Sequence, residues 1–113
     1  MLNTSTQDGI LIVEVKLERL DANVAAEFQD QFGKVITQSD DTVLMDLTQV
    51  TFMDSSGLAA FVFCFQSGYR RNSLAICGAS EKVRSLFKLT RIDQFLKIFD
   101  NRAEAVASLS TTN

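Results

Sequence analysis

Between two apolar runs of this 113-residue chain lies the sequence Met53-Asp54-Ser55-Ser56-Gly57-Leu58. The run before it, Thr42 to Leu47, predicts a buried strand, and the run after it, Leu58 to Tyr69, predicts a helix. The two serines therefore fall where a helix begins, beside backbone N–H groups that lack partners inside the helix. A serine at this position either caps the helix or holds a phosphate against those N–H groups.

Upstream of this sequence the pattern predicts a strand and a helix. The β-branched residues 9–17 predict a strand, and residues 1–8 predict either a short edge strand or a frayed end. Asp21 or Asn23 is expected to cap a helix that follows. Its apolar positions have the spacing of one buried helical face: Val24, Phe28, Phe32, Val35 and Ile36. Residues 38–41 break this helix.

Downstream, strand and helix patterns continue to alternate. The second helix is expected to end near residues 68–72, and residues 73–77 predict a short buried strand. Ser80 is expected to cap a third helix, residues 95–99 predict a last strand, and Asp100 is expected to cap a final helix. Strands separated by helices indicate a largely parallel sheet. We therefore expect one α/β domain over residues 1–113, with a mostly parallel, mixed sheet of four to five strands and about four helices. Its ends, 1–8 and 110–113, are the segments open to fraying.

Composition excludes several classes of function. The net charge of −3 argues against nucleic-acid binding, which normally needs a basic face. The longest apolar run, Leu58 to Phe65, has eight residues, whereas a membrane span needs about 20. Because residues 1–8 have neither a basic start nor an apolar stretch, they do not resemble a signal peptide, and we expect a cytoplasmic location. Cys64 and Cys77 lie in apolar segments without nearby histidine, so neither a metal nor a cofactor is expected.

The sequence Phe52-Met53-Asp54-Ser55-Ser56-Gly57-Leu58, following the predicted strand Val43 to Leu47, resembles the signature of STAS domains. Within that superfamily the chain most resembles the anti-sigma factor antagonists, which are small bacterial cytosolic proteins. The stretch Val83-Arg84-Ser85-Leu86-Phe87-Lys88-Leu89-Thr90 is similar to the family's closing helix, so the resemblance covers nearly the whole chain.

This resemblance implies a phosphorylation switch and not an enzyme. It implies that the serine after the aspartate, here Ser55, is phosphorylated by a partner that is both anti-sigma factor and serine kinase. A serine phosphatase would remove the phosphate, and only the unphosphorylated form would bind the kinase and so free the sigma factor. Ser56 remains an alternative site of modification. ATP belongs to the partner in this interpretation, and the chain itself is expected to be a monomer.

Three residues beside the serines have expected roles. Asp54 either caps the helix or orients the Ser55 hydroxyl toward an incoming γ-phosphate. Gly57 is expected where a Cβ would obstruct the close approach of a partner or of a neighbouring backbone. Asp21 matches an aspartate that the family places near the phosphorylation site. Glu18 stands where the family commonly has glycine, which is a departure from its pattern.

Helical spacing also predicts a partner surface on the second helix. At about 100° per residue, Leu58, Val62, Phe65 and Tyr69 share one face, with Phe61 beside it. Phe63 lies almost opposite, with Ala59 and Ala60, on the side of Ser56. If the first face is the core, Phe63 is exposed and is a candidate interface anchor, together with Ser56 and Ala59. The alternative is a helix that is covered on both sides.

Two other functions compete with the switch. The first is a STAS subunit with a structural role in a transporter-associated or signalling assembly, in which the serines stay unmodified. The second is a small hydrolase with Ser55 as nucleophile. The hydrolase is disfavoured because the chain has no histidine to act as general base and no G-x-S-x-G turn around the serines.

Overall fold

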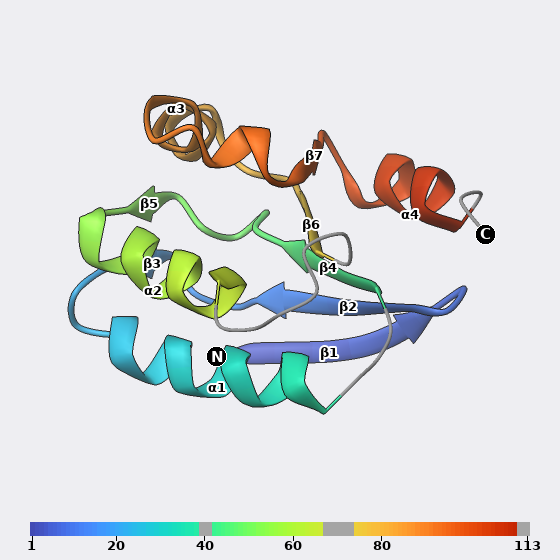
Figure 1. The fold of residues 1–113 in the computed structure, drawn as a ribbon, viewed down its shortest axis with the longest axis horizontal. Coiled ribbons are helices and arrows are strands. Elements are labelled where there is room, and N and C mark those ends of the chain that lie inside the picture. Colours follow the sequence, from blue (N-terminus) through green and yellow to red (C-terminus); the bar gives the residue numbers. More distant parts are fainter. Residues whose placement is uncertain (39–41, 67–73, 111–113) are drawn as a thin grey trace.

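The computed structural model describes residues 1–38, 42–66 and 74–110, with the backbone alone over 64–66. Within these ranges one sheet has the order β1-β2-β4-β6-β7. Its strands are β1 (Leu2–Gln7), β2 (Ile10–Val15), β4 (Thr42–Asp46), β6 (Leu74–Cys77) and β7 (Lys97–Phe99). β1 is antiparallel to β2 and every other pair is parallel (Figure 1). The predicted mixed, mostly parallel sheet is confirmed, and residues 2–7 form its edge strand.

Two smaller strands and the helices complete the domain. β3 (Arg19–Leu20) pairs in parallel with β5 (Phe52–Met53), and this second sheet lies apart from the first. The α-helices in the described ranges are α1 (Ala25–Thr37), α2 (Ser55–Gln66), α3 (Glu81–Leu89) and α4 (Arg102–Ser110). A short 3₁₀ helix, η2 (Ile92–Gln94), follows α3. Every helix in these ranges is too short or too polar to span a membrane.

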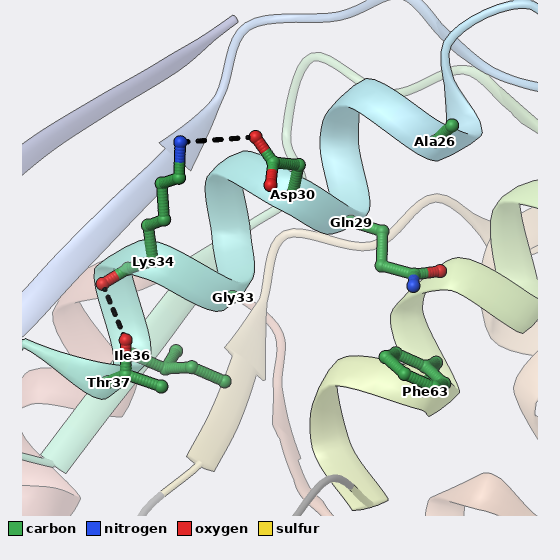
Figure 2. Close-up of a pocket in the computed structure, with 8 residues that line it drawn as sticks. All are labelled: Ala26, Gln29, Asp30, Gly33, Lys34, Ile36, Thr37 and Phe63. Carbon is green, nitrogen blue, oxygen red and sulfur yellow. Dashed lines mark hydrogen bonds and ion pairs between the residues drawn. The ribbon is translucent and has the colours of Figure 1, made fainter.

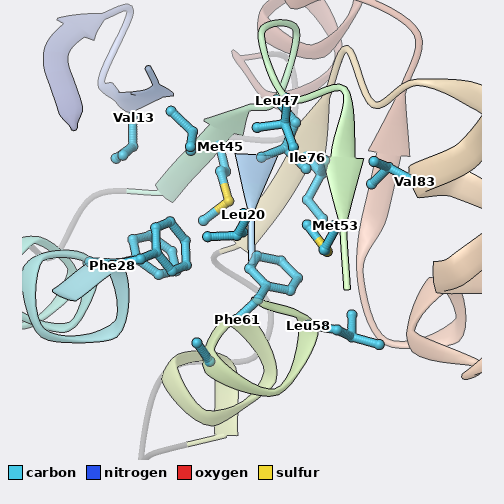
Figure 3. Packing of buried hydrophobic residues seen from close by; sticks show 14 of the residues in the cluster. Val13, Leu20, Phe28, Met45, Leu47, Met53, Leu58, Phe61, Ile76 and Val83 are labelled. Atoms are coloured by element: carbon cyan, nitrogen blue, oxygen red, sulfur yellow. The ribbon is translucent and has the colours of Figure 1, made fainter. Parts of the chain in front are cut away.

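Alternate residues of the strands supply two apolar clusters. The larger cluster contains Val13 and Met45 together with side chains of α1, α2 and α3 (Figure 3). The smaller one contains Ile12 and Leu44 together with Val106 of α4. This division follows from the strand geometry, in which successive side chains point to opposite faces of the sheet. Three helices therefore share one cluster, and α4 belongs to the other.

A stack of phenylalanine rings fixes α2 between its neighbours. The centroids of Phe28 and Phe32 in α1 lie 5.6 Å apart, and Phe32 lies 6.4 Å from Phe61 in α2. Phe61 in turn lies 5.7 Å from Phe87 in α3. All four rings are fully buried. Since each buried phenylalanine contributes about 1.5–3 kcal/mol, this stack holds the three helices in one arrangement.

The Asp46 carboxylate holds α4 against the end of β4. Its Oδ2 accepts hydrogen bonds from Arg102 Nη2 at 2.7 Å and Nε at 3.1 Å. Its Oδ1 accepts the Thr48 backbone N–H at 2.9 Å and the Thr48 hydroxyl. Arg102 also lies 3.6 Å from Glu14. Burial raises the pKa of Asp46, but the bonds from Thr48 and the bond and charge of Arg102 outweigh it, so its pKa lies below its ordinary value.

Three predicted element ends differ in the structure. Neither Asp21 nor Asn23 caps α1: the N-cap is Val24, without a side-chain bond, and the Asp21 carboxylate accepts the Asn23 N–H in a turn before the helix. β7 spans only residues 97–99, because Phe95 is the C-cap of η2 and its N–H donates to the Ile92 carbonyl. Asp100 does not cap α4.

Asn101 takes the place predicted for Asp100. The Glu104 N–H donates to Asn101 Oδ1 at 2.9 Å, and the Asn101 amide donates back to the Glu104 carboxylate at 3.2 Å. Asp100 instead pairs with Arg84 at 2.9 Å. The predicted Ser80 cap is confirmed, since its hydroxyl accepts the Val83 N–H at 3.3 Å. Several predicted features lie outside the described residues: the break at 39–41, the end of the second helix at 68–72, the strand start at 73 and the terminus at 111–113.

Candidate functional site

The first turn of α2 lies against the loop that follows β3. β3 and β5 pair through Arg19–Phe52 and Leu20–Met53, which brings the two chain segments together. The Asp54 N–H then donates to the Leu20 carbonyl at 3.3 Å. Ser55 is the first helical residue, directly after this contact. Helix α2 therefore begins three residues before the predicted start at Leu58, and both serines lie inside its first turn.

Asp54 caps α2. Its Oδ1 accepts the Gly57 N–H at 2.9 Å, and its carbonyl accepts the Leu58 N–H at 2.9 Å. Its Oδ2 accepts the Ala22 N–H at 3.3 Å. Both carboxylate oxygens are thus bound to backbone N–H groups, one in the helix and one in the loop. This is the geometry of an N-cap, the first of the two roles considered for this residue.

Gly57 is required by the close approach of the Leu20 backbone. A Cβ at position 57 would lie 2.0 Å from the Leu20 carbonyl oxygen and 2.9 Å from the Leu20 Cγ. No side chain fits at such a distance, and Gly57 is buried. Of the two reasons expected for this glycine, the structure shows the neighbouring backbone. The helix can meet the loop closely only without a side chain at position 57.

The exposed side chains of α2 form one stripe. Over residues 55–63 the exposed positions are Ser55, Ala59 and Phe63, spaced four residues apart. That spacing places them along one face of a helix, about 12 Å from first to last. Phe63 is 55% exposed, as the helical spacing predicted for a helix whose opposite face is the core. We call Ser55, Ala59 and Phe63 the α2 stripe.

The opposite face of α2 is buried, with one departure from expectation. Leu58 and Phe61 are in the core, and Val62 is half-buried. Ala60, predicted on the side of Phe63, is only 3% exposed, because the larger cluster extends around that edge of the helix. The side chain of Phe65, and Tyr69 as a whole, lie outside the described residues.

Both serines lie at the N-terminus of α2, where opposing charges act on an added phosphate. Ser55 is exposed and Ser56 half-buried. Neither hydroxyl has a hydrogen bond to the protein within the described residues. The positive end of the α2 dipole and the free N–H groups of the first turn lie beside them. The helix terminus, with about half a positive charge, therefore attracts phosphate oxygens at Ser55, whereas the negative charge of the Asp54 carboxylate repels them.

The loop before α1 forms the other side of the site. Asp21 Oδ2 lies 3.3 Å from Arg19 Nε, and the Arg19 guanidinium lies 4.1 Å from the centre of the Phe52 ring. The Glu18 carbonyl accepts the Thr51 N–H at 2.8 Å. Asp21 directly precedes Ala22, whose N–H donates to the Asp54 carboxylate. The loop that carries Asp21 therefore borders the start of α2. The side chain of Glu18 is exposed, and its backbone alone makes this link to the residue before β5.

A groove between α1 and α2 adjoins the stripe, and sequence reasoning did not predict it. Its volume is about 420 Å³, and Phe63 forms its α2 wall (Figure 2). The α1 wall includes Gly33, where an added Cβ would meet nothing within 4 Å, and the Asp30–Lys34 ion pair at 3.3 Å. Glycine inside a helix costs about 1 kcal/mol relative to alanine. No internal contact requires a glycine at position 33. A glycine inside a predicted helix was therefore the one sequence feature that could have indicated the groove.

The described residues contain no group of three or more histidine, cysteine, aspartate or glutamate side chains arranged to hold a metal ion. Cys77 is buried, and this burial, with the nearby Asp46 charge, raises its pKa to about 12. Cys77 is therefore a protonated thiol inside the smaller cluster. Cys64 is a residue of α2 whose side chain lies outside the described residues.

Comparison with known proteins identifies the family. The STAS domain family matches residues 1–105. An anti-sigma-B factor antagonist of Listeria monocytogenes is 31% identical over 80 residues, which cover 70% of each chain. One of Staphylococcus aureus is 26% identical over 98 residues, 86% of this chain and 90% of the relative.

A solved structure shows the same fold. An anti-sigma factor antagonist from Mycobacterium paratuberculosis superposes with a TM-score of 0.82 at 19% identity. The match covers 96% of this chain and 92% of that one. At 19% identity this likeness shows the fold alone. The family assignment depends on the sequence matches. The chain belongs to the anti-sigma factor antagonists of the STAS domain family.

Proposed function

We propose that this protein is a binding module whose docking is switched by phosphorylation of Ser55. In the unphosphorylated form it binds a partner that is both anti-sigma factor and serine kinase, and so frees a sigma factor. The observation that carries the proposal is the α2 stripe, in which the Ser55 hydroxyl and the Phe63 ring share one exposed face. The names of the curated relatives, anti-sigma-B factor antagonists, support the partner class.

The chain supplies a phosphate acceptor and the partner supplies the chemistry. The Ser55 oxygen forms a bond to the γ-phosphorus of ATP held by the kinase. The bond from that phosphorus to the bridging oxygen breaks, ADP leaves, and the hydroxyl proton passes to a base or to water. A serine phosphatase later cleaves the phosphate ester with water. The chain is thus a substrate and a ligand in these steps, not the catalyst.

The switch is a change of charge and size at a rigid surface. A phosphate adds about −1.5 to −2 charge, next to the Asp54 carboxylate that caps the helix. A partner seated on the α2 stripe would have to desolvate this dianion, while the free protein leaves it in water at the helix terminus. A coupling of about 1–3 kcal/mol weakens docking some 5- to 150-fold. No rearrangement of the fold is needed.

Phe63 would serve as the apolar anchor of the interface. Exposed aromatic side chains at the centre of a contact surface supply much of the binding energy of many complexes. The groove beside Phe63, open above Gly33, offers space for a side chain of the partner. Ser56 and Ala59 would lie under the same contact. Small side chains at these positions let the partner approach the helix closely.

The experiment has two steps. Mass spectrometry of the protein after incubation with ATP and cytosol of its source organism should place one phosphate on Ser55. The protein of the cytosol that co-purifies with the unmodified chain is then used in a binding assay with Ser55→Ala, Ser55→Asp and the control Ser5→Asp. The control places the same charge on an exposed serine of β1, outside the α2 stripe, and should bind like the unmodified protein. We expect Ser55→Ala to bind like the unmodified protein and Ser55→Asp to bind at least about fivefold more weakly.

Other outcomes of the same experiment count against the proposal. Phosphate on Ser56 alone would move the switch to the neighbouring residue. An unmodified protein, together with equal binding of Ser55→Ala and Ser55→Asp, would leave a structural STAS subunit as the remaining function.

A further inference from the structure

Two large apolar side chains are exposed to solvent, one at the end of α3 and one just after η2. Leu89 is 82% exposed and Phe95 is 63% exposed, and both exceed Phe63 of the α2 stripe. Leu89 is the last residue of α3, and Phe95 directly follows η2. Neither residue belongs to the surface assigned to the kinase above. Contiguous exposed apolar patches are typical of interaction surfaces, and these two side chains lie at the two ends of one short connection.

The backbone between these two residues is fixed. The Thr90 N–H donates to the Leu86 carbonyl at 3.1 Å, and the Arg91 N–H donates to the Lys88 carbonyl at 3.2 Å. The Phe95 N–H donates to the Ile92 carbonyl at 2.9 Å. Ile92 and Leu96 are buried and anchor the connection in the larger cluster. The backbone that carries the two exposed side chains is therefore ordered before binding, which lowers the entropic cost of binding a partner.

Arg91 adds strain at the centre of this turn. Its φ is +63°, in the left-handed region that glycine or asparagine adopts most easily. A residue held there costs about 1–3 kcal/mol. A glycine would relieve the strain but would remove the guanidinium. The sequence thus keeps a cation at a strained position between Leu89 and Phe95, where local stability would favour another residue.

Charge is distributed unevenly around this turn. Residues 81–97 carry five lysines and arginines against two acidic residues, a net charge of +3, so the rest of the −3 chain carries −6. Arg19, Lys34, Arg84 and Arg102 all form ion pairs. Within the described ranges Lys88 and Arg91 form none. Asp93 lies in the same turn, is exposed and also forms no ion pair within the described ranges, so residues 88–95 have a net charge of +1. The turn therefore presents an excess of positive charge beside its two apolar side chains.

We propose that Lys88, Leu89, Arg91 and Phe95 form a second docking surface, which binds an acidic protein segment carrying apolar side chains. The unpaired cations select the acidic partner, and Leu89 and Phe95 supply the apolar contact. A membrane is a poorer occupant, because stable anchoring requires more buried apolar surface than two side chains provide. Nucleic acid is disfavoured by the negative charge of the chain as a whole. Docking here is independent of the state of Ser55.

The test uses three synthetic 15-residue peptides. The first is rich in glutamate and contains leucine and phenylalanine, the second has glutamine in place of glutamate, and the third has serine in place of the apolar residues. Binding to the full chain is followed by fluorescence anisotropy and by NMR shifts of the protein. We expect the first peptide to bind at least about tenfold more tightly than the other two. Its affinity should fall at high salt, and its binding should shift the NMR signals of residues 88–95.

Variants and vesicles decide the outcome. Lys88→Glu and the pair Leu89→Ser with Phe95→Ser should each weaken binding of the first peptide at least about fivefold, while Lys16→Glu, an equal change of charge at another exposed lysine, should not. Circular dichroism checks that the variants remain folded. Ser55→Asp should leave peptide binding unchanged, which separates this proposal from the switch. Equal binding of all three peptides, no effect of the variants, or binding to phosphatidylglycerol vesicles in place of peptide would overturn it.

Discussion

One oxygen of the Asp54 carboxylate accepts the backbone N–H of Gly57 at 2.9 Å, within the first turn of α2. The other oxygen accepts the N–H of Ala22, in the loop before α1. A single side chain therefore fixes the start of the helix and ties it to a segment distant in sequence. Ser55 lies inside this arrangement, so its hydroxyl projects from a backbone that is held on both sides.

Replacement of Asp54 measures the strength of this tie. Asp54→Ala should lower the free energy of unfolding by about 1–2 kcal/mol, because the helix loses its N-cap and the Ala22 N–H loses its acceptor. Asp54→Asn should cost less, since an asparagine oxygen still caps the helix. Urea unfolding followed by circular dichroism gives both values. Ser80→Ala, which removes the single cap bond of α3, is the control, and equal stability of both Asp54 variants and the parent would refute the assigned role.

Two glycines on neighbouring helices should respond in opposite ways to the same substitution. Gly57→Ala places a Cβ 2.0 Å from the Leu20 carbonyl oxygen and should destabilise the protein by about 2 kcal/mol or more. Gly33→Ala meets nothing within 4 Å and should stabilise α1 by about 0.5–1 kcal/mol. Thermal unfolding of both variants compares them directly. A stabilised Gly57→Ala would show that the close approach of the loop to α2 is wrong.

The groove beside Phe63 is tested by filling it. Gly33→Leu projects a side chain from α1 into the space above the glycine and should weaken docking of the kinase partner by at least about fivefold if a partner side chain enters there. Gly33→Ala, which adds only a methyl group, is the matched control. Calorimetric titration of both variants with the partner gives the affinities. Unchanged binding of Gly33→Leu would restrict the interface to the α2 stripe.

The sequence predicted the elements whose signals are local. Apolar runs predicted β4 and the core face of α2, and cap chemistry predicted Ser80 and the position of Ser55 at a helix start. The predictions failed where a distant partner decides between equivalent local choices. Both Asp100 and Asn101 are competent caps, and Arg84 engages Asp100, so Asn101 caps α4.

Other features depend on geometry that periodicity does not reveal. The strand predicted over 95–99 is shortened because η2 extends to Gln94 and uses Phe95 as its C-cap. The turn into η2 begins at Arg91, whose positive φ is rare for a residue with a side chain. The need for Gly57 was predictable in kind, but the contact with Leu20 depends on the pairing of β3 with β5. The groove could not be predicted from the sequence, because its walls come from α1 and α2 and periodicity does not show which helices are neighbours.

Stability should depend on pH through Asp46. The folded pKa of this carboxyl lies below its ordinary value, so it contributes stability that is complete above about pH 4 and is lost as the pH falls through the folded pKa. Asp46→Asn should therefore be less stable than the parent at pH 7 and should lose less stability between pH 5 and pH 2. Urea unfolding across this range tests it. Asp93→Asn, which removes an exposed carboxylate, is the control. If the free energy of unfolding depended on pH in the same way for Asp46→Asn and the parent, the expected linkage would be contradicted.

Phe61 and Phe63 should separate stability from binding. Phe61 is fully buried and stacks on Phe32 and Phe87, so Phe61→Ala should cost about 3–5 kcal/mol of folding free energy. Phe63 is 55% exposed, so Phe63→Ala should cost less than about 1 kcal/mol. Binding to the kinase partner should show the opposite order. Among molecules that remain folded, Phe61→Ala should bind almost normally and Phe63→Ala should bind weakly. Phe63→Ala should then lose about 2 kcal/mol of affinity, roughly 30-fold. An unchanged affinity of Phe63→Ala would remove the anchor from the α2 stripe and leave Ser55 and Ala59 without an apolar contact beside them.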